Sequence, residues 1–356
     1  MQKAFVVRGE SGSIEDVPVP TPGPGEALVR VLVAAVCNTD LEILKGYMGF
    51  CGVVGHEFCG VVEKAPPLHN SLIGKRVVGD INLCCWNEQQ DCQTCALGGD
   101  RARNHCPKRT VLGILNKDGT YCEWLTLPVV NLHVVPDNVS TENAAFAEPL
   151  AAAFRIAEQN LINKDDRVAI VGDGKLGLLI SEVLGRHLVA LGGAHKPTLF
   201  GRHMDKMRLV SPAAQIEPAL ADSALPASAS TFDVVVDATG SPAGLDLARS
   251  LTRPLGTLVL KSTCAAGTSF NTAPFVVDEL RIVGSRCGPF PPALKLMASG
   301  LDLTPLITAT YPLSEAAQAV EKARTKGTIK VQIRVSEEVA VACGGCGRVS
   351  QDVAVA

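Results

Sequence analysis

The chain has 356 residues, of which 47% are hydrophobic and 19% charged, and its formal net charge is −3 at pH 7. This length predicts two domains rather than one small core. The near balance of 33 basic and 36 acidic residues argues against a nucleic-acid partner. No apolar run reaches the roughly 18 residues that a membrane span needs. The N-terminus enters a strand pattern directly and resembles neither a signal nor a transit peptide, so we expect a cytoplasmic protein with reduced thiols.

The first part of the chain is predicted to be rich in short β-strands. Apolar, β-branched stretches alternate with glycine and proline, and we expect strands within residues 26–36, 53–63, 75–83 and 121–128. Many short strands with such punctuation indicate a partly open barrel. The texture changes near residue 140, where the Ala-rich stretch 139–159 predicts helix, capped by Ser140 or Thr141.

The second part alternates between strands and helices. Strands are predicted within residues 167–173, 197–203, 232–240, 256–263 and 280–288, and helices within 175–188 and 243–253. Apolar strands that alternate with helices indicate a parallel sheet covered on both faces. The stretch 209–231 has no clean period. Helices are then predicted within 291–300 and 314–327, followed by a last strand within 328–335.

A glycine-rich loop follows the strand predicted at 167–173 and opens the next helix. It reads Gly172-x-Gly174-Lys175-Leu176-Gly177, the G-x-G-x-x-G pattern in which glycines and a helix N-terminus receive a dinucleotide pyrophosphate. An ordinary glycine-rich turn is the alternative. These named residues of the stretch 172–177 form the predicted cofactor-binding loop.

The residues that follow the next strand bear on the choice between NAD and NADP. NAD sites usually carry an acid there, about 20 residues after the loop, but no acidic residue lies between Glu182 and Asp205. Arg202 and His203 stand at this point instead. An arginine suits a 2′-phosphate, so the sequence favours NADP over NAD, with a solvated surface arginine as the alternative.

Cysteines form the most conspicuous cluster of the chain. Of the 13 cysteines, five lie between Cys84 and Cys106, including the C-x-x-C pair Cys92 and Cys95. In a cytosolic protein such a cluster more often binds metal than forms disulfides. Cys51, Cys59, Cys122, Cys264 and Cys287 stand in apolar stretches and are predicted to be small core residues. The pair Cys343 and Cys346 lies in a predicted flexible tail, residues 336–356.

Four further residues have the chemistry of metal ligands. Cys37 ends a predicted strand and precedes Thr39 and Asp40, His56 and Glu57 follow about 20 residues later, and Glu148 lies near the expected domain junction. Each is weak evidence alone. Together with the cysteine cluster and the glycine-rich loop they form a pattern.

With these motifs in this order, the chain resembles the medium-chain, zinc-dependent alcohol dehydrogenase family. It is most similar to the branch of threonine, sorbitol and other polyol dehydrogenases, over residues 1 to about 335. The resemblance implies an α/β protein with two domains. A GroES-like, partly open β-barrel catalytic domain would comprise residues 1–154 and 289–335, and a Rossmann domain with a doubly wound parallel sheet would comprise residues 155–288.

The resemblance also implies a role for each motif residue. Cys37, His56 and Glu148 would hold a catalytic zinc ion, with Glu57 as a neighbouring or exchanging ligand. Three protein ligands leave a fourth position open, and zinc there polarises a substrate oxygen. Thr39 would pass a proton outward from that oxygen, and Asp40 would orient His56.

A structural zinc ion would be held by a lobe of four thiolates, Cys85, Cys92, Cys95 and Cys106. The gaps before Cys92 and after Cys95 are longer than in the family, six and ten residues, but longer loops add little closure entropy. Cys84 could take the place of Cys85, and a lobe of free thiols is the alternative.

These expectations describe a zinc-dependent oxidoreductase that uses NADP or NAD and acts on a small-molecule alcohol, polyol or carbonyl substrate. The resemblance suggests a homodimer or homotetramer, and neither nucleic acid nor membrane is an expected partner. Two alternatives remain open at this point. They are a zinc-free NADPH enone or quinone reductase, and a non-catalytic cofactor-binding protein on the same scaffold.

Overall fold

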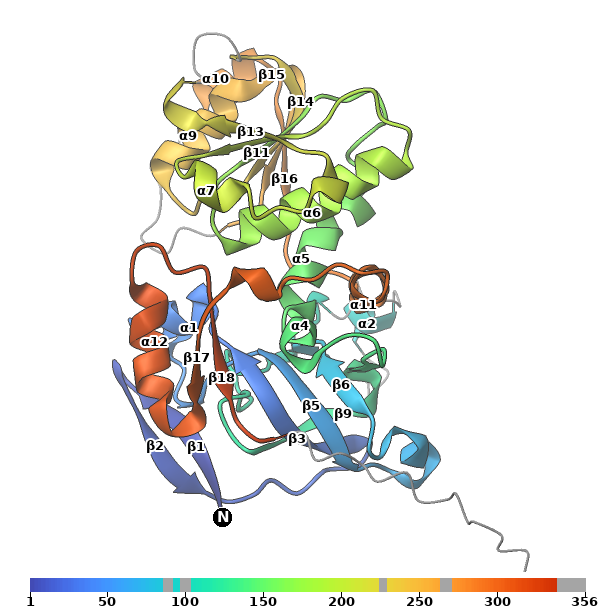
Figure 1. Cartoon of the computed structure of the whole chain (residues 1–356), viewed down its shortest axis with the longest axis vertical. Coiled ribbons are helices and arrows are strands. Elements are labelled where there is room, and N and C mark those ends of the chain that lie inside the picture. Colours follow the sequence, from blue (N-terminus) through green and yellow to red (C-terminus); the bar gives the residue numbers. More distant parts are fainter. Residues whose placement is uncertain (86–91, 97–103, 224–228, 263–270, 338–356) are drawn as a thin grey trace, which may run out of the picture.

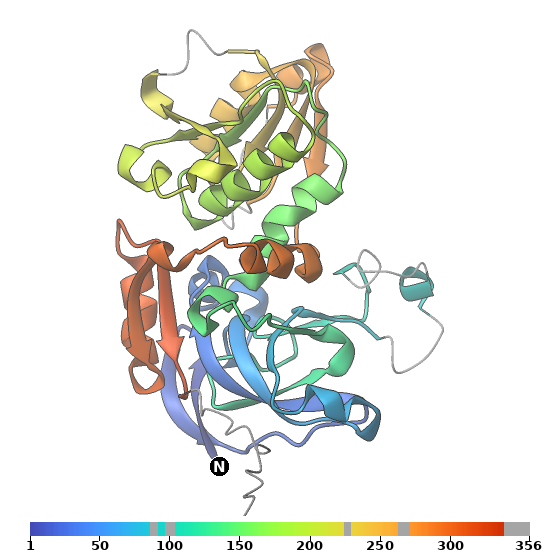
Figure 2. The same cartoon turned by 45° about the vertical axis from the view of Figure 1, so that its right-hand side comes forward.

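The computed structural model describes residues 1–85, 92–96, 104–223, 229–262 and 271–337. It has an upper body built from the middle of the chain and a lower body built from both ends (Figure 1). The view in Figure 2 shows the helix α5 (Ala147–Glu158) running between the two bodies. None of the described helices is long and apolar enough to cross a membrane.

The lower body is built mainly of antiparallel strands. Its largest sheet has seven strands, namely β10 (Leu132–Val134), β6 (Arg76–Gly79), β5 (Glu57–Lys64), β3 (Glu26–Ala35), β18 (Lys330–Arg334) and β17 (Ile307–Pro312) in this order, with β9 (Trp124–Pro128) also paired to β3. Two smaller sheets complete it, β2 (Ser11–Val17) with β1 (Gln2–Arg8) and β4 (Gly52–Val53), and β7 (Asn82–Leu83) with β8 (Thr110–Val111). The β-rich first part of the chain is confirmed.

Strand β3 lies at the centre of this body because it is apolar on both faces. Of its ten residues only Glu26 and Arg30 are half-buried, and the others are buried. It pairs with β5, β9 and β18, all antiparallel. A strand buried on both faces reads as a continuous apolar run, which is what made this strand predictable.

The upper body contains a parallel sheet, as predicted. Its six strands are β13 (Glu217–Leu220), β12 (Thr198–Gly201), β11 (Val168–Val171), β14 (Phe232–Asp237), β15 (Thr252–Leu260) and β16 (Arg281–Gly284) in spatial order. All neighbours are parallel. The order runs outward from β11 in both directions, the arrangement that places ligands beyond the carboxyl ends of the strands.

Both faces of this sheet are covered. Ile170 of β11 packs in a core with residues of α5 and of α6 (Lys175–Ala190). Its neighbours Ala169 and Val171 face the other way, into a core with residues of α9 (Pro242–Leu251) and α10 (Ala273–Val277). Side chains alternate across a strand, so helices on both sides are needed to bury them. The doubly wound sheet is confirmed.

The remaining helices are short or belong to the lower body. They are α1 (Asn38–Ile43), α2 (Gln93–Ala96), α4 (Thr141–Ala144), α7 (Met204–Met207), α11 (Phe290–Ala298) and α12 (Ala316–Arg324). Several 3₁₀ turns connect them: Tyr47–Gly49, Pro67–Leu72, Val129–Asn131, Pro212–Ala214, Ala221–Ser223, Thr304–Leu306 and Leu313–Glu315.

The helix-prone stretch 139–159 forms two helices instead of one. Ser140 caps α4 by accepting a hydrogen bond from the N–H of Asn143 at 3.2 Å. Pro149 lies in the first turn of α5, where its missing N–H is tolerated but could not continue a preceding helix. The break therefore places Glu148 in the first turn of a new helix.

Two further sequence expectations were incomplete or wrong. The prediction that Cys51 is a core residue is wrong, because Cys51 is exposed directly before β4. Cys59 and Cys122 are buried as predicted, and Cys287 is half-buried. Strand β17 was not predicted, since its burial alternates between half-buried and exposed and offers no apolar run. Cys264 and the tail cysteines Cys343 and Cys346 lie outside the described residues.

The backbones of Gly113 and Gly119 pack against Gly55, the residue before His56. Gly55 has φ +94°, and a Cβ there would lie 2.3 Å from the ring of Tyr121. A Cβ on Gly113 or Gly119 would lie 2.1 or 2.2 Å from the carbonyl oxygen of Gly55. At Gly113 and Gly119 no side chain fits without moving backbone, so the loop that carries His56 is held by direct backbone contact.

We predict that Gly119→Ala lowers the free energy of unfolding by about 3 kcal/mol, because the added methyl group overpacks a rigid backbone contact. Gly284→Ala is the matched control, since nothing lies within 4 Å of a Cβ at Gly284, and it should change stability by no more than about 0.5 kcal/mol. Urea denaturation of both variants measures the difference. Equal stabilities would contradict the packing argument.

Candidate active site

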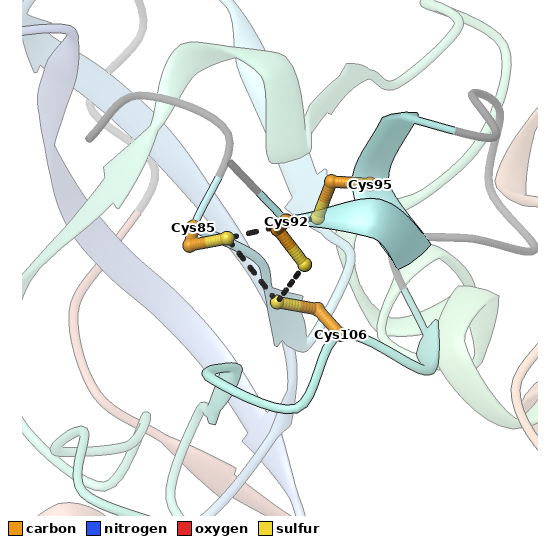
Figure 3. Close-up of side chains that lie close together, drawn as sticks. All are labelled: Cys85, Cys92, Cys95 and Cys106. Atoms are coloured by element: carbon orange, nitrogen blue, oxygen red, sulfur yellow. Dashed lines mark hydrogen bonds between the residues drawn. The ribbon is translucent and has the colours of Figure 1, made fainter. Parts of the chain in front are cut away.

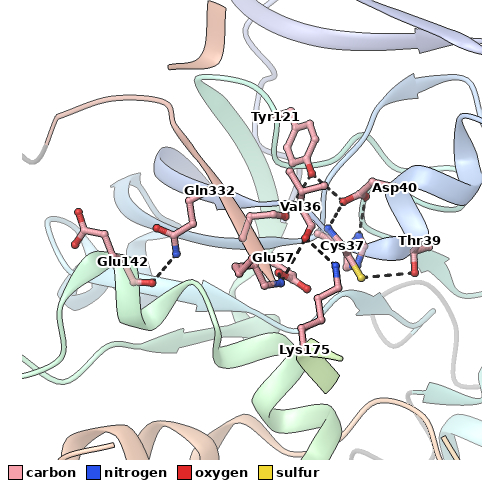
Figure 4. A network of polar contacts seen from close by, with 12 residues as sticks. Val36, Cys37, Thr39, Asp40, Glu57, Tyr121, Glu142, Lys175 and Gln332 are labelled. Atoms are coloured by element: carbon pink, nitrogen blue, oxygen red, sulfur yellow. Dashed lines mark hydrogen bonds and ion pairs between the residues drawn. The ribbon is translucent and has the colours of Figure 1, made fainter. Parts of the chain in front are cut away.

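Cys37, His56 and Glu57 come together at the top of the lower body. Cys37 lies two residues after the end of β3 and directly before α1. Strand β5 begins at Glu57, which pairs with Ala35 of β3. This register places the two strand ends side by side. One ligand atom from each of the three side chains lies within 4.8 Å of the others. Figure 4 shows Cys37 and Glu57 in this network.

Asp40 contacts two of these residues, Cys37 and His56. It has no exposed surface. Its Oδ2 accepts hydrogen bonds from the N–H of Cys37 and the O–H of Tyr121, both at 2.8 Å, and its Oδ1 lies 3.2 Å from His56 Nδ1. Burial alone would raise the pKa of Asp40, but His56 and the two donors lower it below its usual value. The group is therefore a carboxylate.

The same contact decides which nitrogen of His56 is available to a ligand. Nδ1 lies 3.2 Å from Asp40 Oδ1, which leaves Nε2 as the nitrogen for a metal ion. Burial lowers the pKa of His56, while Asp40 and Cys37 outweigh it and raise the pKa well above the usual value. A ring clamped by a carboxylate on one nitrogen is the usual arrangement of a metal-binding histidine. Cys37, His56 and Glu57 thus offer the donor types that zinc takes.

Glu57 is bound by a lysine from the far end of the chain. Lys330 of β18 forms an ion pair with Glu57 Oε2, and both side chains are almost completely buried, 0% and 1% exposed. The ammonium also lies 5.6 Å from the ring centre of Phe146 and 3.5 Å from the carbonyl oxygen of Val36. Burial lowers the pKa of Lys330, but Glu57 and Cys37 raise it more. No local pattern singles out Lys330, because its partner is 273 residues away in the chain.

Glu148 lies near this cluster but outside it. Among the described residues, the group within ligand distance contains Glu57 and not Glu148. Burial raises the pKa of Glu148 to about 7, with a further rise from Glu57 and opposing effects of His56 and Lys330. The role of Glu148 as a ligand stays a prediction. Glu57, which the sequence analysis treated as a neighbouring or exchanging ligand, lies within ligand distance of Cys37 and His56.

The glycine-rich loop lies at the carboxyl end of β11, where a dinucleotide site requires it. Gly172 has φ +118°, a conformation that favours glycine. A Cβ on Gly177 would lie 1.8 Å from the carbonyl oxygen of Gly172, whereas a Cβ on Gly174 would meet nothing within 4 Å. The three glycines therefore serve the turn, an open approach for a ligand, and close contact between loop and helix. Leu176 is half-buried against the core of the upper body.

Lys175 connects this loop to the metal-ligand cluster. It is the first residue of α6, and its Nζ donates a hydrogen bond to the carbonyl oxygen of Val36 at 3.3 Å. Val36 precedes Cys37, so the ammonium bridges the upper and lower bodies beside the cluster (Figure 4). Burial and the nearby Lys330 lower the pKa of Lys175, although Cys37, Glu57 and Asp40 oppose them.

Arg202 and His203 stand at the end of β12, as expected, and Arg202 is exposed. The sequence did not anticipate their partner. Asp173, the second residue of the glycine-rich loop, accepts hydrogen bonds from the backbone N–H groups of Arg202 at 2.8 Å and His203 at 2.6 Å. An acid therefore does lie at the end of β12, but it comes from another segment.

The four predicted lobe cysteines form a second cluster. Cys85, Cys92, Cys95 and Cys106 hold their sulfur atoms within 4.8 Å of one another (Figure 3). Three of the Sγ–Sγ distances are 3.4, 3.8 and 3.9 Å. Four thiolates around one zinc ion at about 2.3 Å leave neighbouring sulfur atoms about 3.8 Å apart, so the cluster fits a tetrahedral zinc ion. Cys84 is not part of the described group. The two long gaps of this lobe fall largely outside the described residues.

The thiols of this cluster cannot all ionise without a cation. The N–H of Cys95 lowers the pKa of Cys92 to about 7, against the effect of burial. Burial and the thiol of Cys106 raise the pKa of Cys85 to about 11. A metal ion removes this conflict, since its charge deprotonates coordinating thiols.

Comparison with known proteins places this geometry among dehydrogenases. Residues 23–137 match the family model of the alcohol dehydrogenase GroES-like domain. The chain is 26% identical over 324 residues to L-threonine 3-dehydrogenase of Legionella pneumophila, covering 86% of this chain and 92% of the relative.

Solved structures agree in fold over nearly the whole chain. A Sinorhizobium meliloti protein described as a zinc-binding dehydrogenase, bound to NADP, has a TM-score of 0.80 and 26% identity, covering 94% of this chain and 99% of the other. An Escherichia coli alcohol dehydrogenase complexed with NADH has a TM-score of 0.81 and 24% identity with the same coverage. The lower and upper bodies are thus a GroES-like barrel and a Rossmann-like sheet, as the sequence predicted.

We predict that Cys92→Ser lowers the zinc content of the purified, reduced protein by one ion per chain, because a four-thiolate site loses a ligand. Cys51→Ser is the matched control: it removes an exposed thiol outside both described clusters, so its zinc content should equal that of the unmodified chain. Metal analysis by plasma emission measures both. A Cys92→Ser protein that keeps all its zinc would refute the four-thiolate site.

Proposed function

Because this chain belongs to the medium-chain, zinc-dependent alcohol dehydrogenase family, we propose that it transfers a hydride between a nicotinamide cofactor and an alcohol or polyol, or the corresponding carbonyl compound. One observation carries the proposal. Lys175 of the glycine-rich loop contacts the residue next to Cys37, so a cofactor on that loop and a substrate at the metal-ligand cluster would lie side by side, as hydride transfer requires.

The metal-ligand cluster would hold the catalytic zinc ion through Cys37, His56 and either Glu57 or Glu148. Zinc bound there would supply Lewis-acid polarisation of the substrate oxygen. Asp40 keeps His56 in one orientation and one tautomer. Lys330 neutralises Glu57 within the cluster and so limits the repulsion among its anionic groups.

Thr39 is the residue we propose for proton movement. It is half-buried in α1, and its hydroxyl lies 3.8 Å from Cys37 Sγ, within reach of a substrate oxygen held beside that sulfur. A hydroxyl group can accept one hydrogen bond while it donates another. Thr39 can therefore take the proton of an alcohol and release it toward solvent.

Two rival functions are less well supported. A zinc-free enone or quinone reductase has no need of the clustered Cys37, His56 and Glu57. A cofactor-binding protein without turnover has no need of a hydroxyl beside these ligands. Loss of activity on zinc removal would separate the proposed enzyme from the first rival, and any turnover would exclude the second.

The comparisons do not distinguish NADP from NAD as the cofactor, since one structural neighbour was solved with NADP and another with NADH. Arg202 favours NADP through its charge. Asp173 adds a negative charge at the same place, and the sequence argument did not include it. The preference for NADP therefore stays a prediction that this acid opposes.

The test of the proposed function is turnover of an alcohol and polyol panel with NAD⁺ and NADP⁺, before and after zinc removal and restoration. We expect zinc-dependent turnover. We also expect Thr39→Val to lower kcat by about 10²-fold or more, the usual contribution of a positioned proton-transfer group, while the Kd of the reduced cofactor stays unchanged.

Thr39→Ser is the matched control, because it keeps the hydroxyl group and should keep most of the activity. Equal kcat values for the Val and Ser variants would remove Thr39 from the proposed mechanism. Absence of turnover in the zinc-loaded chain over the whole panel would overturn the proposed activity.

We further propose that the chain forms a homodimer or homotetramer. Strand β16 is one of the two outer strands of the parallel sheet. Ile282 of this strand is 40% exposed, and Val276 and Val277 of α10 are 73% and 79% exposed. An uncovered edge strand with apolar neighbours is a ready surface for pairing. Light scattering after size exclusion should give a mass two or four times 37.3 kDa; a monomer mass would refute this proposal.

A further inference from the structure

The end of β12 holds an acid that no linear reading of the chain would place there. Gly201 is the last residue of β12. A Cβ added to Gly201 would lie 2.5 Å from Cβ and 2.9 Å from Cγ of Asp173. The side chain of Asp173 therefore occupies the space that a side chain at position 201 would need. The absence of a side chain at Gly201 makes room for the carboxylate of Asp173.

This carboxylate is fixed in place. Its Oδ2 accepts hydrogen bonds from the backbone N–H groups of Arg202 and His203 and lies 2.9 Å from His203 Nδ1. Asp173 is only 8% exposed. Burial raises its pKa, but the contacts with His203 and Arg202 outweigh burial and lower it. Asp173 is thus a held negative charge at neutral pH.

The geometry leaves one oxygen of Asp173 for a ligand. All three contacts fall on Oδ2, and the described residues offer no hydrogen bond to Oδ1. An acceptor at the end of the second strand of a dinucleotide-binding sheet is the group that binds the adenosine ribose 2′-hydroxyl. Asp173 can supply that acceptor from within the phosphate-binding loop itself.

The same arrangement disfavours a 2′-phosphate. The two N–H groups that could receive a phosphate oxygen already donate to Asp173, and a phosphate there would face a carboxylate of like charge. Cations are present to oppose this effect. A cleft of about 490 Å³ next to His203 is lined by Lys206 of α7 and Lys326 of the segment before β18, and Arg202 is exposed beside it. These three side chains are long and solvent-accessible, whereas Asp173 is buried and fixed.

We infer that Asp173 takes the place of the missing acid at the end of β12 and makes the site select NAD(H) over NADP(H). This inference rests on the proposed function only in assuming a nicotinamide dinucleotide at the glycine-rich loop. It assigns the choice between the two cofactors to a residue that lies 28 positions before Gly201, the last residue of β12.

The experiment compares the affinities of ADP and 2′,5′-ADP for the full-length, zinc-loaded chain by titration calorimetry. These two probes differ by the 2′-phosphate and need no substrate or turnover. We expect the unmodified chain to bind ADP at least tenfold more tightly. Asp173→Asn keeps the size of the side chain and removes its charge, and it should shift the affinity ratio at least tenfold toward 2′,5′-ADP.

Asp205→Asn is the matched control, because Asp205 is an exposed acid that lines the same cleft. Its affinity ratio should stay within threefold of the unmodified chain. Asp173→Ala tests the same shift without an amide, and circular dichroism checks that each variant is folded. NADH and NADPH titrations should follow the order of the two half-cofactors.

Two outcomes would overturn the inference. One is tighter binding of 2′,5′-ADP by the unmodified chain. The other is an affinity ratio that neither Asp173 variant changes, which would leave Asp173 with a structural role in the loop. If the unmodified chain binds neither nucleotide, the dinucleotide site itself fails, and the proposed function with it. Binding with the expected ratio but no turnover would overturn the proposed activity alone.

Discussion

The buried carboxylate of Asp40 is the interaction on which the candidate active site depends. A charge without exposed surface is tolerated only when it is paired and hydrogen-bonded, and Asp40 finds its partners on three separate segments. Cys37 precedes α1, His56 precedes β5, and Tyr121 precedes β9. The need to satisfy one carboxylate thus fixes the cysteine and the histidine relative to each other. The glycine backbones packed at Gly55 hold the loop on the other side of His56.

A second buried pair ties the end of the chain to this centre. Lys330 lies in the last described strand, and that strand inserts between β3 and β17. Removing one partner of a buried ion pair typically costs about 3–5 kcal/mol, because the other charge is left uncompensated. The pairing of Lys330 with Glu57 therefore makes the metal-ligand cluster dependent on the C-terminal strand. The upper body contributes the ammonium of Lys175 to the same centre.

Most of the fold could be predicted from the sequence. Of the site residues, only those that belong to local motifs could be predicted. Apolar strands such as β3 are visible as continuous apolar runs. The cysteine cluster is visible as a motif, but the sequence left Cys84 and Cys85 open as its first member, and the structure groups Cys85 with the other three. Predictions failed where the deciding contact is distant in sequence. Lys330 and Glu57 are 273 residues apart. Asp173 was missed because the search for an acid followed a sequence offset, whereas a ribose site requires only that an acid reach a point in space. The exposure of Cys51 shows the converse, since apolar neighbours in sequence did not bury it.

The charges around Cys37 indicate what the centre favours chemically. In the zinc-bound centre Cys37 would be a thiolate and His56 a neutral imidazole, so Cys37, Asp40 and Glu57 would carry three negative charges. The ammonium groups of Lys175 and Lys330 would offset two of them and leave one. A divalent zinc ion would reverse the sign and leave one positive charge in a largely buried site. Such a balance favours negative charge developing on a substrate oxygen. Glu148 limits this positive charge. Burial raises the pKa of Glu148 to about 7 in the metal-free chain, and ionisation of Glu148 would bring the net charge of the centre to zero. Ionisation of Glu148 would therefore change the electrostatics of the centre even if Glu148 never becomes a metal ligand.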